Sequence, residues 1–236
     1  MGTLYIVATP IGNLEDMTFR ALRILFDVDY IACEDTRRTS LLLSELQTRY
    51  VTMFRNIVTK KPVCVSYYDQ TELTKTPEIL ELLRSGKSVA LVSDAGTPLI
   101  SDPGYILVRE ARKHGVPVVS IPGPSALLTA LTSSGLPADK FLFLGYPPEK
   151  QSHRLKLFQD LLSIHRCIDS TYIFYCAPHK LAGTLEDMKQ VFGDIDITVA
   201  RELTKVHEEI WTGTLSEAQL HFSDPKGEFV IMFKIL

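Results

Sequence analysis

Short apolar runs alternate with segments of helical spacing along the first half of the chain. Five strands are predicted by the apolar runs, at residues 4–8, 30–33, 63–67, 89–93 and 116–121. Helices are predicted between them, at residues 14–26, 39–46, 77–84 and 102–114. Pro77 stands at a typical first-turn position, and Gly86 and Gly115 are typical helix stops. The alternation indicates an α/β fold with a mostly parallel sheet and helices on both faces.

The second half begins after the densest turn signal of the chain, Pro-Gly-Pro at residues 122–124. We therefore predict an N-terminal α/β domain at residues 1–121 and a C-terminal α/β domain at residues 122–236. Helices are predicted at residues 125–134, 155–164 and 181–192, with a short one from 216. Strands are predicted at residues 141–145, 172–175, 197–200, 207–214 and 229–235. The last strands follow one another like hairpins, so the second sheet is expected to be mixed. The polar residues 147–156 predict a mobile surface loop.

Composition narrows the class of protein only slightly. The 236 residues are 45% apolar and carry a net charge of −3, which suits two packed domains and argues against coating nucleic acid through a bulk positive field. A local basic patch remains compatible with this charge. The four cysteines form no CxxC pair, which is typical of a reducing compartment without disulfides or structural zinc. No targeting signal precedes the first strand, and the uncharged residues 115–138 contain four prolines, so we expect a cytoplasmic protein without a membrane span.

The segments after the five N-terminal strands are the best candidates for chemistry, because open α/β sheets bind ligands beyond the carboxyl ends of their strands. Clusters of Gly, Pro, Asp and Glu follow these strands, at residues 9–13, 34–38, 68–72, 94–98 and 122–126. Their meeting at one sheet edge predicts a binding cleft. GxGxxG, P-loop and HExxH motifs are absent, and no His/Cys cluster suggests a metal. Small residues and carboxylates suit a cationic ligand, or one bound mainly through backbone groups.

Six strings carry a specific resemblance: LYIVATPIGNL at 4–14, ACEDTR at 32–37, VSDAGTP at 92–98, SDPG at 101–104, PGPSA at 122–126 and ARELTK at 200–205. Together they resemble the tetrapyrrole methylase (class III) superfamily, in its branch of 16S rRNA (cytidine-2′-O-)-methyltransferases. The resemblance covers residues 3 to about 232. It implies an S-adenosylmethionine-dependent enzyme with two α/β domains, a cofactor folded into the cleft between them, and a homodimer. The expected partner is 16S rRNA in the 30S subunit.

Carried over by position, the resemblance also implies the cofactor contacts. These are Pro10, Asp94, Ala95, Gly96, Thr97, Ser125, Ala126, Tyr175, Cys176, Ala177, Ala200, Arg201 and Gly227. The chemistry of these residues agrees with the assignment. Small side chains leave room for adenosine, and carbonyl and carboxylate oxygens favour a sulfonium cation.

The acceptor side leaves more alternatives open. A ribose hydroxyl is a poor nucleophile, so alignment and a general base both help, and the candidate bases are Glu34, Asp35 and Asp102. Asp35 and Asp102 could instead cap the helices that follow them. The expected RNA contacts are Arg37, Arg38, Lys150, Arg154 and His179. An internal ion pair is the alternative for Arg37, and an ordinary surface histidine is the alternative for His179.

The chain departs from the family pattern in four places. Residues 66–72 read SYYDQTE and lack the two histidines usual there, so a histidine base from this loop is excluded. Lys180 stands where an arginine is usual, and residues 147–156 are less basic than in relatives. The chain also stops soon after residues 226–229, so we expect weak binding to naked RNA and a dependence on the assembled subunit. Two alternative functions are kept: a methyltransferase acting on a tetrapyrrole-like small molecule or a protein side chain, and a cofactor-binding ribosome-assembly protein without catalysis.

Overall fold

The computed structural model describes residues 1–50 and 61–235 of the chain. They form two compact units, Met1–Ser125 and Ala126–Leu236, here the N-terminal and C-terminal units. The division falls a few residues later than the boundary predicted before Pro122, because the Pro-Gly-Pro turn packs on the N-terminal unit. Thr97 Oγ1 donates a hydrogen bond to the Pro124 carbonyl (2.9 Å), and a Cβ added to Gly123 would lie 2.9 Å from the Ala8 Cβ.

The N-terminal unit is built on a five-stranded sheet of order β3-β2-β4-β1-β5. Its strands are β1 (Leu4–Val7), β2 (Tyr30–Cys33), β3 (Val63–Ser66), β4 (Val89–Leu91) and β5 (Val118–Ile121). Every pair in this sheet is parallel, which confirms the predicted fold class. All five strands therefore end at the same edge of the sheet, and the candidate segments that follow them start there.

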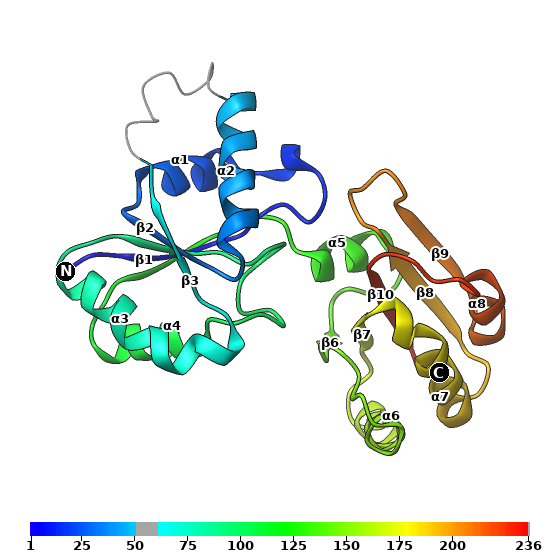
Figure 1. Ribbon diagram of the computed structural model, residues 1–236. Coiled ribbons are helices and arrows are strands. Elements are labelled where there is room, and N and C mark those ends of the chain that lie inside the picture. Colours follow the sequence, from blue (N-terminus) through cyan, green and yellow to red (C-terminus); the bar gives the residue numbers. More distant parts are fainter. Residues whose placement is uncertain (51–60, 236) are drawn as a thin grey trace. The chain divides into compact units, whose positions relative to one another are not determined.

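Two helices cover each face of this sheet (Figure 1). The helices α1 (Phe19–Asp27) and α2 (Thr36–Tyr50) lie on one face, and α3 (Glu72–Arg84) and α4 (Tyr105–Lys113) lie on the other. Separate apolar clusters fill the two sides, with Leu22, Leu25 and Leu46 in the first and Leu83 and Leu107 in the second. Burial of the apolar surface of each of these leucines stabilises the folded unit by roughly 1.5–3 kcal/mol. Short 3₁₀ turns at Leu14–Asp16 and Asp69–Thr71 precede α1 and α3.

All four helix starts of the N-terminal unit were predicted wrongly. The helix α1 begins at Phe19 and not at residue 14, because Thr18 caps it after the 3₁₀ turn. The helix α3 begins at Glu72 and not at Pro77, because a turn directly before Glu72 starts the helix earlier. In this turn the Tyr68 N–H donates a hydrogen bond to Thr71 Oγ1 (3.1 Å). Pro77 then removes one helical bond to the Leu73 carbonyl, where water can compensate because Leu73 is largely exposed. The helix α2 starts at Thr36, three residues before its predicted start, and α4 starts at Tyr105, three residues after its predicted start.

The C-terminal unit contains a second five-stranded sheet, of order β6-β7-β10-β8-β9. Its strands are β6 (Phe141–Phe143), β7 (Thr171–Cys176), β8 (Asp196–Arg201), β9 (Glu209–Thr214) and β10 (Phe229–Lys234). The pair β6–β7 is parallel and the other pairs are antiparallel, so the sheet is mixed as predicted. The helices of this unit are α5 (Ala126–Ser133), α6 (Gln151–His165), α7 (Pro178–Phe192) and α8 (Leu215–His221).

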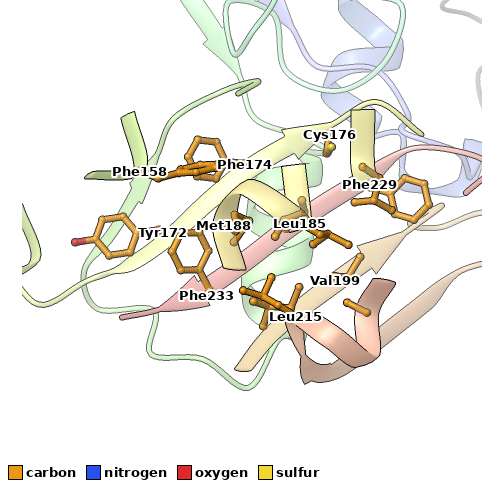
Figure 2. Packing of buried hydrophobic residues seen from close by; sticks show 14 of the residues in the cluster. Phe158, Tyr172, Phe174, Cys176, Leu185, Met188, Val199, Leu215, Phe229 and Phe233 are labelled. Carbon is orange, nitrogen blue, oxygen red and sulfur yellow. The ribbon is translucent and has the colours of Figure 1, made fainter. Parts of the chain in front are cut away.

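Alternate residues of β10 divide the C-terminal unit into two packing layers. Phe229, Ile231 and Phe233 point into an aromatic-rich cluster that contains side chains of α6, α7 and α8 (Figure 2). Val230 and Met232 are buried on the opposite side of the strand, and α5 also packs against β10. This core fixes the ends of β7, β8 and β10, where the predicted C-terminal cofactor contacts lie.

Residues 147–156 do not form the predicted surface loop throughout. The helix α6 begins at Gln151, and Arg154 in its first turn is buried against Asp187 of α7, with a distance of 2.7 Å from Nε to Oδ2. One charged residue of this polar segment, Arg154, therefore belongs to a buried ion pair and not to a surface loop. Within the residues that the structure describes, no helix has the length and apolar character that a membrane crossing requires.

Candidate functional site

Three strand ends of the N-terminal unit are fastened together at the sheet edge. Thr9, after β1, and Gly96, after β4, exchange both backbone hydrogen bonds (2.9 and 3.0 Å). The buried Thr9 hydroxyl also donates to the Ser93 carbonyl (3.0 Å), and Thr97 Oγ1 reaches Pro124 after β5. The loop that follows β4, here the β4 loop, spans residues 92–104. Its first half is therefore held by the ends of β1 and β5.

Asp94 lies at the centre of this edge. Its backbone N–H donates to Glu34 Oε1 (3.3 Å), after β2, and its Oδ2 pairs with Arg38 Nη1 at 2.9 Å. Asp94 Oδ1 is shielded from solvent and has no hydrogen-bond partner in the described part of the chain. A buried, unpartnered carboxylate oxygen is costly unless a ligand satisfies it. This atom therefore marks a place where a hydrogen-bond donor or a cation fits.

Asp35 caps α2. Its Oδ1 accepts hydrogen bonds from the backbone N–H groups of Arg37 (2.7 Å) and Arg38 (3.3 Å). These bonds lower the pKa of Asp35 below its usual value. A carboxylate with a lowered pKa is a weaker base, so the geometry supports the capping alternative for Asp35 over a role as general base.

Glu34 and Asp102 have the opposite electrostatics. Burial raises the pKa of Glu34, and the negative charges of Asp102, Asp94 and Asp69 add to this, against the hydrogen bond from the Asp94 N–H. Burial likewise raises the pKa of Asp102, against a hydrogen bond with Ser93. The pKa values of both carboxyl groups are thus shifted toward neutral pH, as is favourable for a general base. In the described residues, no three His, Cys, Asp or Glu side chains are arranged to hold a metal ion.

Asp102 also differs from the expectation that it caps α4, because the helix begins at Tyr105 and its N-cap position is Gly104. Ser93, which contacts Asp102, was not among the predicted site residues. It is buried at the end of the β4 apolar run, where the sequence pattern makes it look like an ordinary strand residue.

The predicted RNA contacts divide by exposure. Arg37, Lys150 and His179 are exposed, and the side chain of Arg38 is 72% exposed although it pairs with Asp94. Arg154 is different, since its guanidinium bonds Asp187 and the backbone carbonyls of the preceding loop. Its burial argues against a contact with RNA. An internal ion pair was the alternative for Arg37. Arg154 forms such a pair with Asp187, and Arg38 forms a more exposed pair with Asp94.

The end of β7 is packed into the C-terminal unit. The Tyr175 hydroxyl accepts a hydrogen bond from the Leu127 N–H (3.1 Å) in the first turn of α5, directly after Ala126. Cys176 is buried, and burial raises the pKa of its thiol to about 11. Ala177 follows as the N-cap residue of α7. These contacts fix the backbone of the predicted cofactor segment.

A hollow of about 550 Å³ opens beside β8. Arg201 and Gly227, two predicted cofactor contacts, line it together with Glu202, His207, Glu208, Glu209 and Lys226. The Arg201 Nε–H donates to the Lys226 carbonyl (2.8 Å), whereas Ala200 is buried in the strand. The volume lies within the usual range of small-molecule sites. The lining residues supply charges of both signs, as a zwitterionic ligand requires.

Comparison with known proteins first defines the class. Residues 3–219 match the family model of Tetrapyrrole (Corrin/Porphyrin) Methylases. Among solved structures, the methyltransferase CobJ superposes with a TM-score of 0.68 at 19% identity, covering 99% of this chain and 95% of that one. Uroporphyrin-III C-methyl transferase from Thermus thermophilus, complexed with S-adenyl homocysteine, gives 0.63 at 17% identity, covering 98% and 97%. Both likenesses confirm the fold.

Sequence relatives then define the branch. The chain is 44% identical to Ribosomal RNA small subunit methyltransferase I of Thermotoga maritima, covering 98% of each chain. It is 47% identical to the protein of that name from Synechocystis, covering 98% of this chain and 78% of that one. The chain belongs to the ribosomal RNA small subunit methyltransferase I family of the tetrapyrrole methylases.

Proposed function

We propose that the protein transfers the methyl group of S-adenosylmethionine to the 2′-hydroxyl of a cytidine ribose in 16S rRNA of the small subunit. Membership in the family makes the chain an S-adenosylmethionine-dependent methyltransferase. What we propose beyond family membership is the atom that receives the methyl group, the 2′-hydroxyl of a cytidine ribose. The observation that carries it is the pair of half-buried carboxyl groups, Glu34 and Asp102, with raised pKa values at the sheet edge. A hydroxyl acceptor needs such a group, because its proton must leave as the new bond forms.

The residues at the N-terminal edge fit the cofactor. Gly96 has φ +82°, and a side chain there would approach Ile11 Cγ2 at 3.3 Å, so only glycine leaves this backbone open to a ligand. The unpartnered Asp94 Oδ1 offers an acceptor to a cationic or donor group. We propose that the cofactor is bound here by Pro10, Asp94, Ala95, Gly96, Thr97 and Ser125.

The C-terminal contacts carried over from the resemblance are part of the same proposal: Ala126, Tyr175, Cys176, Ala177, Ala200, Arg201 and Gly227. The hollow lined by Arg201 and Gly227 supports this assignment. When bound, the cofactor supplies an activated methyl group. This chain's residues then orient the donor and the acceptor and hold the proton that leaves the ribose.

We propose that RNA is bound in part by Arg37, Lys150 and His179, whose side chains are exposed. Arg38 is retained as a weaker candidate because Asp94 already neutralises part of its charge. With so few exposed cations among the predicted RNA contacts and a net charge of −3, the acceptor is best recognised as an assembled 30S subunit and not as naked RNA. A cytoplasmic homodimer belongs to the same proposal.

The test is transfer of tritium from labelled S-adenosylmethionine to 30S subunits, followed by nucleoside analysis for 2′-O-methylcytidine. Asp102→Asn and Glu34→Gln each remove one candidate base while keeping its shape. We expect the variant that removes the true base to lower kcat by about 10²–10⁴-fold, with cofactor affinity little changed. Asp160→Asn, an exposed carboxylate on α6, serves as the matched control and should behave like the wild type.

The negative charge keeps a second candidate open, namely methylation of a tetrapyrrole-like small molecule or a protein side chain. Label found only in such an acceptor would replace the rRNA proposal. Calorimetric binding of the cofactor without transfer to any acceptor would instead favour an assembly protein that has lost catalysis.

A further inference from the structure

Glu72, the first residue of α3, connects two distant parts of the N-terminal unit. Its Oε1 accepts hydrogen bonds from the backbone N–H groups of Gly104 (2.7 Å) and Ile106 (3.2 Å). The same oxygen accepts a hydrogen bond from the Tyr67 hydroxyl (3.0 Å). Tyr67 is fully buried, and its hydroxyl also pairs with Thr76 Oγ1 at 3.1 Å. One carboxylate oxygen therefore joins the segment after β3 to the end of the β4 loop.

This contact supplies the cap that α4 lacks locally. Gly104 has no side chain to cap the helix, and Asp102 does not take that place. The Glu72 carboxylate satisfies two N–H groups at the start of α4 and brings a negative charge to the positive end of the helix dipole. The cap comes from 32 residues away in the sequence, so it fixes tertiary structure as well as the helix end.

The second half of the β4 loop needs such a restraint. Leu99 and Ser101 have positive φ angles of 74° and 65°, and Gly104 has φ +134°. Non-glycine residues in this region are strained, and they persist only where the surroundings hold them. Gly104 is enclosed as well, because an added Cβ would lie 2.6 Å from Leu91 Cδ2.

The two halves of the β4 loop thus have separate fastenings. Residues 94–97, the proposed cofactor segment, are held by Thr9 and Pro124. Residues 99–104, which include the proposed base Asp102, end at the Glu72 carboxylate. Asp102 also hydrogen-bonds Ser93, in the half of the loop that Thr9 holds. We therefore expect a change at Glu72 to release Asp102 on one side only and to leave the anchors at Thr9 and Pro124 in place.

We propose that Glu72 is a positioning residue that holds Asp102 in place for the acceptor and so controls turnover without controlling cofactor affinity. This inference rests on the proposed function, since it assigns Asp102 a role in the reaction. It differs from a purely structural role in two measurable ways, which are the split between kcat and cofactor affinity and the pH dependence.

The pH dependence follows from the surroundings of Asp102. The titratable groups that face it are Asp69, Asp94 and Glu34, all acidic, and burial raises its pKa further. Releasing residues 99–104 from Glu72 admits water to Asp102 and weakens these effects. Its pKa then falls toward the usual value, so the acid limb of the kcat profile moves to lower pH.

The experiment compares Glu72→Ala, Glu72→Gln and Glu78→Ala. Glu78 lies on the same helix and, within the described residues, forms an exposed pair with Lys75 (2.7 Å) and no other ion pair, so Glu78→Ala is the matched control. We expect Glu72→Ala to lower kcat about 10- to 100-fold, the size expected for a misplaced catalytic group, with the calorimetric Kd for the cofactor within about twofold of wild type. Glu72→Gln keeps an acceptor oxygen for the two N–H groups and should recover much of the loss. Glu78→Ala should match the wild type.

A second readout does not depend on activity. Carboxyl ¹³C NMR of aspartate-labelled protein, with the Asp102 signal assigned through Asp102→Asn, follows its titration directly. We expect a lower pKa in Glu72→Ala than in wild type, and an intermediate value in Glu72→Gln, which also carries the test if the alanine variant does not fold. An unchanged Asp102 titration, or a loss of cofactor affinity equal to the loss of kcat, would overturn the positioning role.

These outcomes separate the two proposals. If wild-type protein transfers no methyl group to 30S subunits but the Asp102 titration shifts in Glu72→Ala, the proposed function fails and the restraint on Asp102 stands. If wild type is active on 30S subunits and both variants keep its kcat and its Asp102 titration, the proposed function stands and the role of Glu72 fails.

Discussion

The β4 loop of the N-terminal unit and the β8 loop (residues 202–208) of the C-terminal unit pose the same conformational problem. Each contains two non-glycine residues with positive φ, Leu99 and Ser101 in the first and Glu202 and Thr204 in the second. Each also follows a strand whose end supplies proposed cofactor contacts. Both loops therefore need external restraints, and the restraints they have are of different kinds.

The β4 loop is held by hydrogen bonds to buried or backbone groups, at Thr9 and at Glu72. The β8 loop is held by exposed charges in addition to backbone hydrogen bonds, such as that from the Glu202 N–H to the Glu228 carbonyl (3.0 Å). Lys205 Nζ lies 2.9 Å from Oε1 of Glu202 and 2.9 Å from Oε2 of Glu228, whose side chain is 76% exposed. Salt screens exposed charges strongly and buried hydrogen bonds weakly. The comparison predicts that the anchors of the β4 loop at Thr9 and Glu72 depend little on ionic strength, whereas the ion pairs of the β8 loop weaken as salt is added.

Gly104→Ala should give the largest effect, because it disturbs packing at the end of the β4 loop. The added Cβ meets Leu91 and Leu99 in the core, and alanine at φ +134° is strained. We expect a loss of about 2–4 kcal/mol in the free energy of unfolding of the N-terminal unit. Urea denaturation followed by far-UV circular dichroism measures it.

Trp211, the one tryptophan of the sequence, lies in β9 and reports on the C-terminal unit alone. Its fluorescence midpoint should not move in Gly104→Ala. Gly115→Ala is the matched control, since Gly115 has φ +72° but nothing within 4 Å of an added Cβ. An equal loss in both variants would mean that backbone strain, and not packing at Gly104, sets the cost.

Gly227→Ala should have a smaller effect, of about 1–2 kcal/mol. Gly227 has φ +92°, and its added Cβ would lie 2.5 Å from Glu202 Cγ, a side chain that can move. Displacing Glu202 loosens the β8 loop, so Trp211 fluorescence should report the loss during urea unfolding. A cost as large as that of Gly104→Ala would show that the β8 loop is as rigid as the β4 loop.

Lys205→Met should have the smallest effect and the clearest dependence on salt. Removing the ammonium group breaks both ion pairs, and we expect a loss of about 0.5–1 kcal/mol at low ionic strength. The difference from wild type should shrink toward zero in 1 M sodium chloride, because the Debye length falls to about 3 Å. Thr97→Val removes an uncharged hydrogen bond of the β4 loop, so its cost should stay constant with salt. A constant cost for Lys205→Met would remove the distinction between the loops.

Much of the fold could be predicted because its signals are local. The apolar runs of β1 to β5 and the turn residues after them specify parallel strands with their loops at one edge. Capping of α2 by Asp35 was available as an alternative for the same reason, since a cap and its helix are adjacent in sequence. Local rules are sufficient wherever a residue acts on its immediate neighbours.

The rest depends on contacts that no local rule contains. Glu72 caps a helix 32 residues away, and Arg154 pairs with Asp187 33 residues away. The first contact was not foreseen, and the second made an interior residue look like an RNA contact. A charged side chain in a polar segment has the same sequence signature in solvent and in a buried ion pair. Only the packing of α6 on α7 distinguishes the two at Arg154.

The buried Cys176 thiol at the end of β7 has a consequence for unwanted methylation of the protein itself. Burial raises the pKa of the Cys176 thiol to about 11, so this side chain is almost entirely protonated at pH 7. Thiolates are far better nucleophiles than ribose hydroxyls, and the thiolate is the reactive form of cysteine. In the proposed cofactor site, which includes Tyr175, Cys176 and Ala177, a reactive thiolate would compete with the acceptor for the methyl group. Under that proposal, burial of Cys176 removes a competing nucleophile from the site.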